Sequence, residues 1–418
     1  MSSSTSSPTG TTTTQTPPST ITGAPDAIPI NQVTSGMSSG TPIPPSTTYP
    51  PGSRPTWDGA PPLPSPFVYK KEEWPIQDHV VDPSLFPDRM AIWMKELEGV
   101  DIPNIPQTDG TCAGSPDNFA KAADNAWWSC GGHTRPTDIT ACPTKYTWGV
   151  SFDDGPGPYT GKLLKFLDEK DVKATFFVVG SRVIERPSIL IEEYMSGHEI
   201  SVHTWSHRLL TTLTNEQIVA ELAFTREAIK RVLGVTPTTM RPPQGDIDDR
   251  VRAISLALGL VPIMWTSTPT AGKFDTNDWR VAGGYVTGEQ SYNTFQSILG
   301  NASLLDTGFI VLQHDVHFAT VELATGYTLD AALTHQPKFT LQPIGECLGL
   351  PTSNLYVETT FNKTFPSDKT KASVTGAVQS KNGTSSDTSN NTNNSALVAG
   401  APFVSGLLSV VGLLVTLL

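Results

Sequence analysis

The middle of the chain predicts an α/β fold built on parallel strands, and three observations lead to this prediction. From Thr147 onward, short apolar segments alternate with longer amphipathic segments, as strands and helices do in a βαβ chain. The segment 174–179 (A-T-F-F-V-V) is apolar on both faces, which is typical of a parallel strand covered by helices. Polar clusters follow several of these segments, at the strand ends where chemistry gathers in a parallel barrel.

Residues that start and stop helices support this alternation. Pro187 suits the first turn of one helix, and Thr214 and Gly234 suit the two caps of the next. The expected strands are residues 148–152, 174–179, 199–202, 238–241, 260–265 and 309–312. The expected helices are residues 161–169, 187–197, 214–233, 246–258, a stretch from about 289, and 320–333.

Composition divides the 418 residues into a core and two flanks. Residues 1–66 are rich in Ser, Thr, Pro and Gly, so we expect a disordered segment, with the composition of an O-glycosylated stalk. Residues 67–145 are expected to form a cap without chemistry, with one amphipathic helix at 88–99. The core then spans 146–350, and a second polar linker spans 351–395. The net charge of −12 argues against a nucleic-acid partner.

The C-terminal end, residues 396–418, has the layout of a GPI-anchor signal. Small residues, with Asn394 and Ser395 as attachment candidates, precede a short spacer and the apolar tail 403–418. A tail-anchor helix is the alternative. No signal peptide is visible after Met1, so a missing 5′ end is our interpretation if the protein is secreted. Sequons that suit passage through the secretory pathway lie at Asn301, Asn362, Asn382, Asn390 and Asn393.

Four cysteines, at 112, 130, 142 and 347, match no zinc cluster, and an even number in a secreted chain indicates two disulfides. Sequence leaves three pairings open. We favour Cys142 with Cys347, which closes the start of the core onto its end, and Cys112 with Cys130.

Two acids, Asp153 and Asp154, stand where the first strand meets Gly155 and Pro156. Adjacent residues at a strand end point in different directions, so one carboxylate can bind a metal while the other holds a water. A solvated D-D-G turn is the alternative interpretation. His203 and His207 follow the third strand four residues apart, and with Asp154 they make the three-ligand set of a catalytic zinc site. Two surface histidines are the alternative.

Three further clusters follow later strands. Arg241 opens a rigid R-P-P-Q-G loop and suits a bidentate carboxylate pair. D-T-N-D-W at 275–279 offers that carboxylate and an aromatic wall, and L-Q-H-D at 312–315 places His314 at a strand end.

Taken together and in this order, the motifs F-D-D-G-P, H-T-W-S-H, R-P-P-Q-G, D-T-N-D-W and L-Q-H-D resemble the polysaccharide deacetylases of carbohydrate esterase family 4 (the NodB homology domain). The resemblance covers roughly residues 145–335 and is strongest to the fungal GPI-anchored chitin deacetylases. It implies a distorted (β/α) barrel with parallel strands and fewer than eight regular repeats.

The resemblance also implies roles. Asp153 corresponds to the general base, His314 to the general acid, and Asp154, His203 and His207 to the ligands of Zn²⁺, with Co²⁺ as a substitute. Asp275 corresponds to the tether that orders Arg241. Trp279 and Leu312 correspond to the walls of an acetyl-methyl pocket, and the Gln244 N–H to an oxyanion donor.

Three features depart from the family pattern. Gln244 stands where an aromatic residue is usual, about seven extra residues at 266–274 precede Asp275, and the signal peptide is absent.

The function expected from this resemblance is a chitin deacetylase that acts in the fungal cell wall. It would hydrolyse N-acetyl groups to give chitosan and acetate, and work as a secreted monomer held at the plasma membrane by its lipid anchor. Two alternatives stay open: a deacetylase of another acetylated polysaccharide, and a catalytically inactive wall protein that binds polysaccharide.

Overall fold

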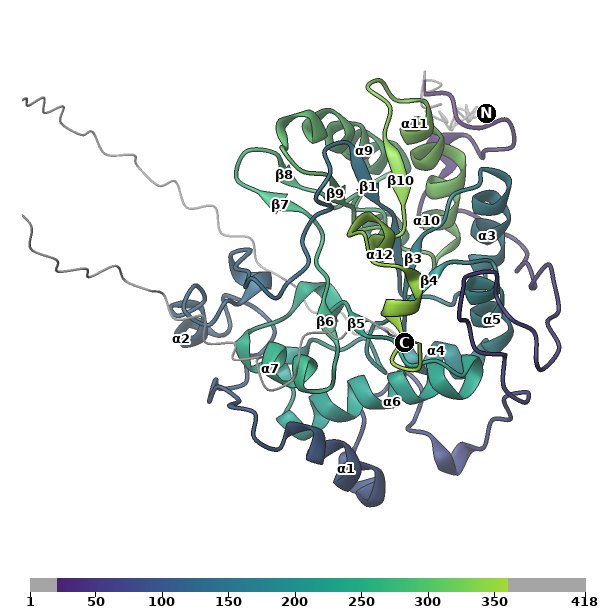
Figure 1. The fold of residues 1–418 in the computed structure, drawn as a ribbon. Coiled ribbons are helices and arrows are strands. Elements are labelled where there is room, and N and C mark those ends of the chain that lie inside the picture. The colour runs from purple at the N-terminus through teal and green to yellow at the C-terminus, as the bar shows by residue number, and fades with distance from the viewer. Residues whose placement is uncertain (1–20, 360–418) are drawn as a thin grey trace, which may run out of the picture. The chain divides into compact units, whose positions relative to one another are not determined.

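The computed structural model describes residues 21–359 (Figure 1). The C-terminal anchor signal, the attachment candidates Asn394 and Ser395, and most of the linker lie outside the described residues. So do the sequons at Asn362, Asn382, Asn390 and Asn393. Within residues 21–359, no helix has the length and apolar character needed to cross a membrane.

Two parallel sheets form the core. The first has the order β2-β3-β4-β5-β6, and the second has the order β10-β1-β9. The strands are β1 (Thr147–Gly149), β2 (Ser151–Asp153), β3 (Thr175–Val178), β4 (Glu199–Val202), β5 (Thr239–Met240), β6 (Val261–Pro262), β7 (Ser267–Thr268), β8 (Gly272–Lys273), β9 (Phe309–Ile310) and β10 (Thr340–Gln342).

Only Val150 separates β1 from β2, so one extended stretch of chain contributes to both sheets. An isolated parallel bridge between Asp153 and His314 links β2 to the segment after β9. The result is an irregular barrel of parallel strands, and the predicted α/β fold class is confirmed.

Helices cover the outside of this barrel. α3 and α5 lie on one side, while α6 and α7 lie below β4–β6, with α1 packed on the outer face of α6 (Figure 1). The helices are α1 (Pro87–Met94), α2 (Pro116–Phe119), α3 (Thr160–Glu169), α4 (Gly180–Glu185), α5 (Pro187–Met195), α6 (Asn215–Leu233), α7 (Asp249–Ala257), α8 (Trp279–Ala282), α9 (Gly288–Asn301), α10 (Phe318–Leu323), α11 (Leu329–Thr334) and α12 (Ile344–Cys347).

The caps of α6 follow the sequence closely. Thr214 and Gln217 form a reciprocal capping box at its start, and Gly234 ends it in the left-handed conformation with φ of 81°. The final expected helix is interrupted, because a π-helical turn at Ala324–Thr328 separates α10 from α11.

Residues 21–66 depart from the expected disorder. Ile30 and Val33 are buried in a small apolar cluster with Leu323. The backbone N–H of Ser46 donates to Glu192 on α5 across 2.8 Å. A few apolar anchors and backbone hydrogen bonds therefore hold a segment whose average composition is polar, and the segment borders α3, α5 and α10 (Figure 1).

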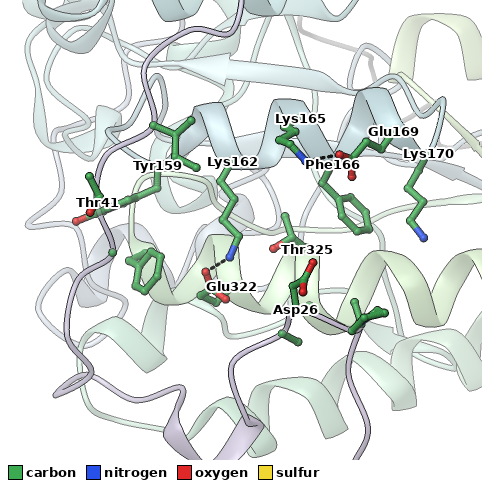
Figure 2. A pocket seen from close by; sticks show the side chains of 17 residues that line it. Asp26, Thr41, Tyr159, Lys162, Lys165, Phe166, Glu169, Lys170, Glu322 and Thr325 are labelled. Atoms are coloured by element: carbon green, nitrogen blue, oxygen red, sulfur yellow. Dashed lines mark hydrogen bonds and ion pairs between the residues drawn. The ribbon is translucent and has the colours of Figure 1, made fainter.

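Packing of this segment creates a pocket of about 490 Å³ against α3 and α10 (Figure 2). Tyr159 and Thr41 lie at one end, Lys162 points across the pocket to Glu322, and Lys165 runs along α3 toward Glu169 (Figure 2). Lys162 pairs with Glu322, and Lys165 pairs with Glu169, so the charges of both lysines are compensated within the pocket.

The structure contains two disulfides, Cys112–Cys130 and Cys142–Cys347. The second joins residues 205 positions apart, just before β1 and at the end of α12. The remaining described sequon, Asn301, ends α9 half-buried, and its side-chain amide donates to the carbonyl of Ala271.

Candidate active site

The turn after β2 separates its two carboxylates. Asp153 ends the strand and is buried, while Asp154 adopts a left-handed conformation with φ of 80°. Two hydrogen bonds hold this strained residue: its N–H donates to the Phe177 carbonyl across 3.1 Å, and Arg182 Nη1 donates to its carbonyl across 2.6 Å. Because a positive φ redirects the side chain, adjacent acids can serve different functions.

Asp154, His203 and His207 converge on one point. Their ligand atoms all lie within 4.8 Å of one another. Asp154 Oδ1 lies 3.4 Å from Nε2 of His203 and 3.1 Å from Nε2 of His207. The segment after β4 makes this convergence possible, since both Thr204 and His207 take positive φ values that curl the chain back.

The chemistry of these donors fits a divalent cation. The Nδ1 atom of His203 lies 2.7 Å from the Arg241 carbonyl, which can only accept, so Nδ1 carries a proton and Nε2 is the ring nitrogen that faces Asp154. Oδ1 of Asp154 is buried without a hydrogen-bond donor. Burial lowers the pKa of His207 to about 4, in spite of the opposing charge of Asp154. Two imidazoles and one carboxylate form the three-ligand set of catalytic zinc sites.

Asp153 lies beside this triad and is held by Arg241. Nη1 of Arg241 donates to Oδ1 of Asp153 across 2.6 Å and to the Ser151 hydroxyl across 3.0 Å. The other oxygen of Asp153 lies 3.9 Å from Nε2 of His203. Arg241 thus fixes one carboxylate oxygen and leaves the second one facing the triad.

This arrangement corrects the expected role of Asp275. Its carboxylate accepts from the N–H of Asn277 across 2.9 Å and lies 3.9 Å from Nζ of Lys273, while the ion-pair partner of Arg241 is Asp153. The physical reason is proximity: the buried guanidinium at the end of β5 reaches across the sheet to β2.

Asp278 is a residue that the sequence analysis did not single out. Its Oδ1 lies 2.7 Å from Nδ1 of His314, and its Oδ2 accepts from the backbone N–H of His314 across 2.8 Å. Burial opposes protonation of His314, but Asp278, and then Asp154 and Asp153, raise the pKa of His314 to about 10. The second acid of the D-T-N-D-W motif was the signal that could have identified this partner.

The remaining predicted residues surround these groups at different depths. Gln244 is exposed on the turn Pro243–Gly245, where its φ is 55°. Trp279 begins α8 with 45% of its surface exposed, whereas Leu312 is buried and pairs with Asp275 in an isolated bridge. Their roles toward a substrate stay predictions.

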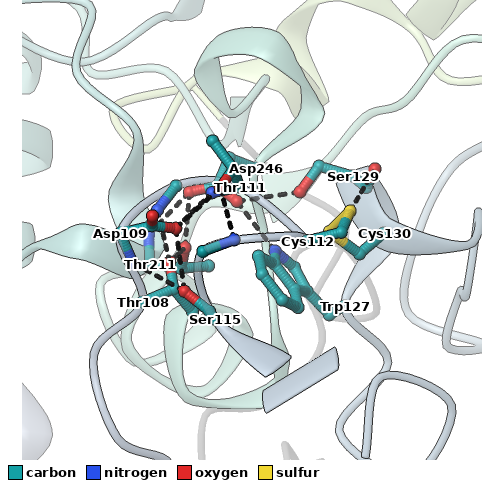
Figure 3. Close-up of a disulfide and its surroundings, with 12 residues drawn as sticks. Thr108, Asp109, Thr111, Cys112, Ser115, Trp127, Ser129, Cys130, Thr211 and Asp246 are labelled. Atoms are coloured by element: carbon teal, nitrogen blue, oxygen red, sulfur yellow. Dashed lines mark hydrogen bonds between the residues drawn. A yellow bond between two sulfur atoms is a disulfide. The ribbon is translucent and has the colours of Figure 1, made fainter. Parts of the chain in front are cut away.

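The cap contacts the loops of the site through a buried carboxylate, Asp246 (Figure 3). Its Oδ1 accepts from Trp127 and Ser129, which lie just before Cys130 of the Cys112–Cys130 disulfide, and its Oδ2 accepts from the N–H and hydroxyl of Thr211. The cap, the loop after His207 and the loop after Arg241 therefore form one connected wall.

The barrel brings a carboxylate, a triad that fits a divalent cation and a buried acid–histidine pair together at its strand ends. This arrangement is that of a hydrolase built on a parallel barrel. Residues 140–263 match the family described as polysaccharide deacetylase. Chitin deacetylase 1 of Cryptococcus neoformans var. grubii is 48% identical over 339 residues, which are 80% of this chain and 71% of that protein. The chain belongs to the polysaccharide deacetylase family, as the motifs predicted.

Other similarities are more limited in extent. Chitin deacetylase 2 of the same fungus is 38% identical over 248 residues, which are 57% of this chain and 51% of that protein. The solved structure of the chitin deacetylase from Colletotrichum lindemuthianum superposes with a TM-score of 0.46 and 28% identity. That superposition covers 53% of this chain and 96% of the other.

Proposed function

We propose that the protein is a metal-dependent chitin deacetylase that hydrolyses the N-acetamido groups of N-acetylglucosamine residues to give chitosan and acetate. The observation that carries the proposal is the placement of Asp153, His314 and the triad Asp154–His203–His207 around one region of the barrel. The similarity to proteins named chitin deacetylases supports chitin as the substrate.

Asp154, His203 and His207 would hold the metal, for which we propose Zn²⁺, with Co²⁺ as a substitute. When bound, such an ion polarises the amide carbonyl and acidifies a water. The protein fixes the donor set beforehand, because the Arg241 carbonyl orients His203 and the backbone contacts of Asp154 orient its carboxylate.

Asp153 is the proposed general base. Its free oxygen faces the triad, and Arg241 prevents the side chain from turning away. The carboxylate takes the proton of the attacking water as the oxygen–carbon bond forms.

His314 is the proposed general acid. Asp278 keeps its imidazole protonated and fixes the ring from both Nδ1 and the backbone. An amine leaves only poorly until it is protonated, so transfer of this proton to the nitrogen accompanies cleavage of the carbon–nitrogen bond. Acetate and a glucosamine unit result.

The substrate contacts are proposed from the motif positions. Trp279 and Leu312 would flank the acetyl methyl group, and the Gln244 N–H would donate to the oxyanion. The exposure of Trp279 and the positive φ of Gln244 suit residues that face a bound polymer.

We further propose that the protein is secreted and acts as a monomer in the cell wall and at the plasma membrane, where a GPI anchor would hold it. The two disulfides support an oxidising compartment. The anchor itself depends on residues outside the described part of the chain, so treatment of cells with a GPI-specific phospholipase would test it by release of the protein.

The experiment that tests the proposed reaction is acetate release from N-acetylglucosamine oligomers by purified protein. The assay is run before chelation, after chelation and after addition of zinc. We expect release that disappears with the chelator and returns with zinc. Absence of release from fully metal-loaded protein would contradict the proposal and favour another acetylated polymer or a binding protein.

A further inference from the structure

Two unusual features of the sequence meet in space beside the candidate active site. The first is the turn that carries Gln244, and the second is the β7–β8 hairpin formed by the extra residues before Asp275. Gly245 packs so tightly that a Cβ atom there would lie 2.3 Å from Trp128 and 3.0 Å from Trp265. These two indoles, in T-shaped contact at 4.4 Å, connect the cap to the turn.

The hairpin places one ammonium group on the same pair of indoles. Nζ of Lys273 lies 5.4 Å from the ring centroid of Trp128 and 5.3 Å from that of Trp265. It also lies 3.9 Å from Oδ2 of Asp275. Three attractive contacts hold the charge in place, and yet 52% of the side chain is exposed. Lys273 therefore presents its ammonium group at the surface, between the two indoles and the carboxylate of Asp275.

This charge stands at the rim of the site. Asp275 pairs in an isolated bridge with Leu312, two residues before His314, and Gln244 is exposed on the turn packed against the two indoles. The carboxylate of Asp275 lies deeper, with 12% of its side chain exposed, so the ammonium is the outer member of the pair. A polymer bound across the triad would pass this rim.

We infer that Lys273 is a specificity-determining residue, which makes the site favour N-acetylated neighbours over glucosamine neighbours on the bound chain. The inference rests on the proposed function. Deacetylation converts a neutral acetamide into an amine that is protonated in mildly acidic solution. A glucosamine unit next to Lys273 therefore brings two positive charges together, whereas an N-acetylglucosamine unit does not.

The test compares two oligosaccharides of equal length. One is fully N-acetylated, and the other carries a single glucosamine beside the target unit. Their dissociation constants and their values of kcat/KM are measured for the wild type and for Lys273→Met, in which the apolar stem can still cover the indoles. We expect the preference for the acetylated oligomer to fall about two- to fourfold in the variant, which is the change that one half-exposed charge at roughly 10 Å produces at an effective dielectric constant of about 40 to 80.

Three controls make the result specific. Lys273→Arg keeps the charge and should keep the preference. Lys338→Met removes an exposed lysine just before β10, at the opposite end of the strands, and should also keep it. In the wild type, the preference should shrink in 0.5 M salt, because screening weakens exposed charges.

An unchanged preference in Lys273→Met, or an equal fall in Lys338→Met, would overturn the inference. If the proposed function is wrong but the inference is right, the result differs. The wild type would then bind the two oligosaccharides with different dissociation constants and release no acetate from either.

Discussion

Arg241 donates a 2.6 Å hydrogen bond to Oδ1 of Asp153, and the two side chains are 0% and 2% exposed. The guanidinium also lies 3.9 Å above the ring of Phe177, which limits its movement. A buried ion pair of this kind is costly to break, because removal of one partner leaves the other charge unpaired in a dry environment. The pair therefore fixes the rotamer of the proposed base.

Arg241→Lys should lower kcat/KM by about 100-fold with little loss of bound metal, because an ammonium cannot reproduce the paired contacts to Asp153 and Ser151. Asp275→Asn, which leaves these contacts intact, should cost less than about tenfold. Steady-state acetate release measures both variants. An equal loss in the two variants would restore Asp275 as the tether.

Asp153→Asn should retain metal and lose about 10²- to 10⁴-fold in turnover, because an amide cannot accept the proton of the attacking water. Circular dichroism should accompany the assay, since this change leaves Arg241 buried without its counter-ion. A folded, zinc-loaded variant with wild-type turnover would rule out Asp153 as the base.

Asp278→Asn should move the alkaline limit of activity to lower pH by about one to two units. His314 must carry a proton to act as the acid, and its pKa of about 10 depends on Asp278 against the effect of burial. Loss of that negative charge lowers the pKa, so the proton is lost at a lower pH. Both proteins are compared with the same metal content, because a bound cation also lowers the pKa of His314. An unmoved pH profile would contradict the assignment.

The same pair makes a prediction for stability. The pKa of His314 is higher in the folded protein than the ordinary value of 6.5, so the pair stabilises fully below about pH 6.5. This contribution is lost as the pH rises through about 10. Urea titrations at several pH values should show a smaller alkaline loss of unfolding free energy in Asp278→Asn than in the wild type.

The sequence predicted the site best where one short motif contains both the end of a strand and the site residues that follow it. F-D-D-G-P and H-T-W-S-H predict both the strand ends and the residues that converge, because strand alternation and turn residues are local properties. The strands themselves are shorter than expected. β5, β6 and β9 are each only two residues long, since backbone pairing in an irregular barrel depends on curvature that the sequence does not display.

Long-range contacts account for what could not be predicted. The choice of Asp153 over Asp275 as partner of Arg241 depends on the distance across the sheet, and the role of Asp278 depends on the path of the loop after β9. β10 at 340–342 was not expected, because its residues alternate little and its pairing with β1 is set by closure of the barrel. The order of residues 21–66 likewise comes from a few anchors such as Ile30.

His203→Ala should lose bound zinc, as measured by elemental analysis after dialysis. Without His203 only two of the three protein ligands remain, which are too few to hold zinc tightly. Zinc should also raise the melting temperature of the wild type but not that of the variant, because only binding to the folded state stabilises it. His133→Ala, a change in the cap outside the triad, is the matched control and should keep its zinc. Unchanged zinc content in His203→Ala would contradict the ligand set.

The two disulfides should differ in their contribution to stability. Cys142–Cys347 closes a loop with a sequence separation of 205, and Cys112–Cys130 one of 18. The loop-entropy model predicts about 5 kcal/mol for the longer loop and about 3 kcal/mol for the shorter one. The paired substitution Cys142→Ala with Cys347→Ala should therefore lower the unfolding free energy more than Cys112→Ala with Cys130→Ala.

The shorter loop, however, connects through Trp127 and Ser129 to Asp246 and thus to the loops of the site. Its removal should reduce kcat/KM more than its effect on stability suggests, and equal activity in the two double variants would show that the cap does not position those loops.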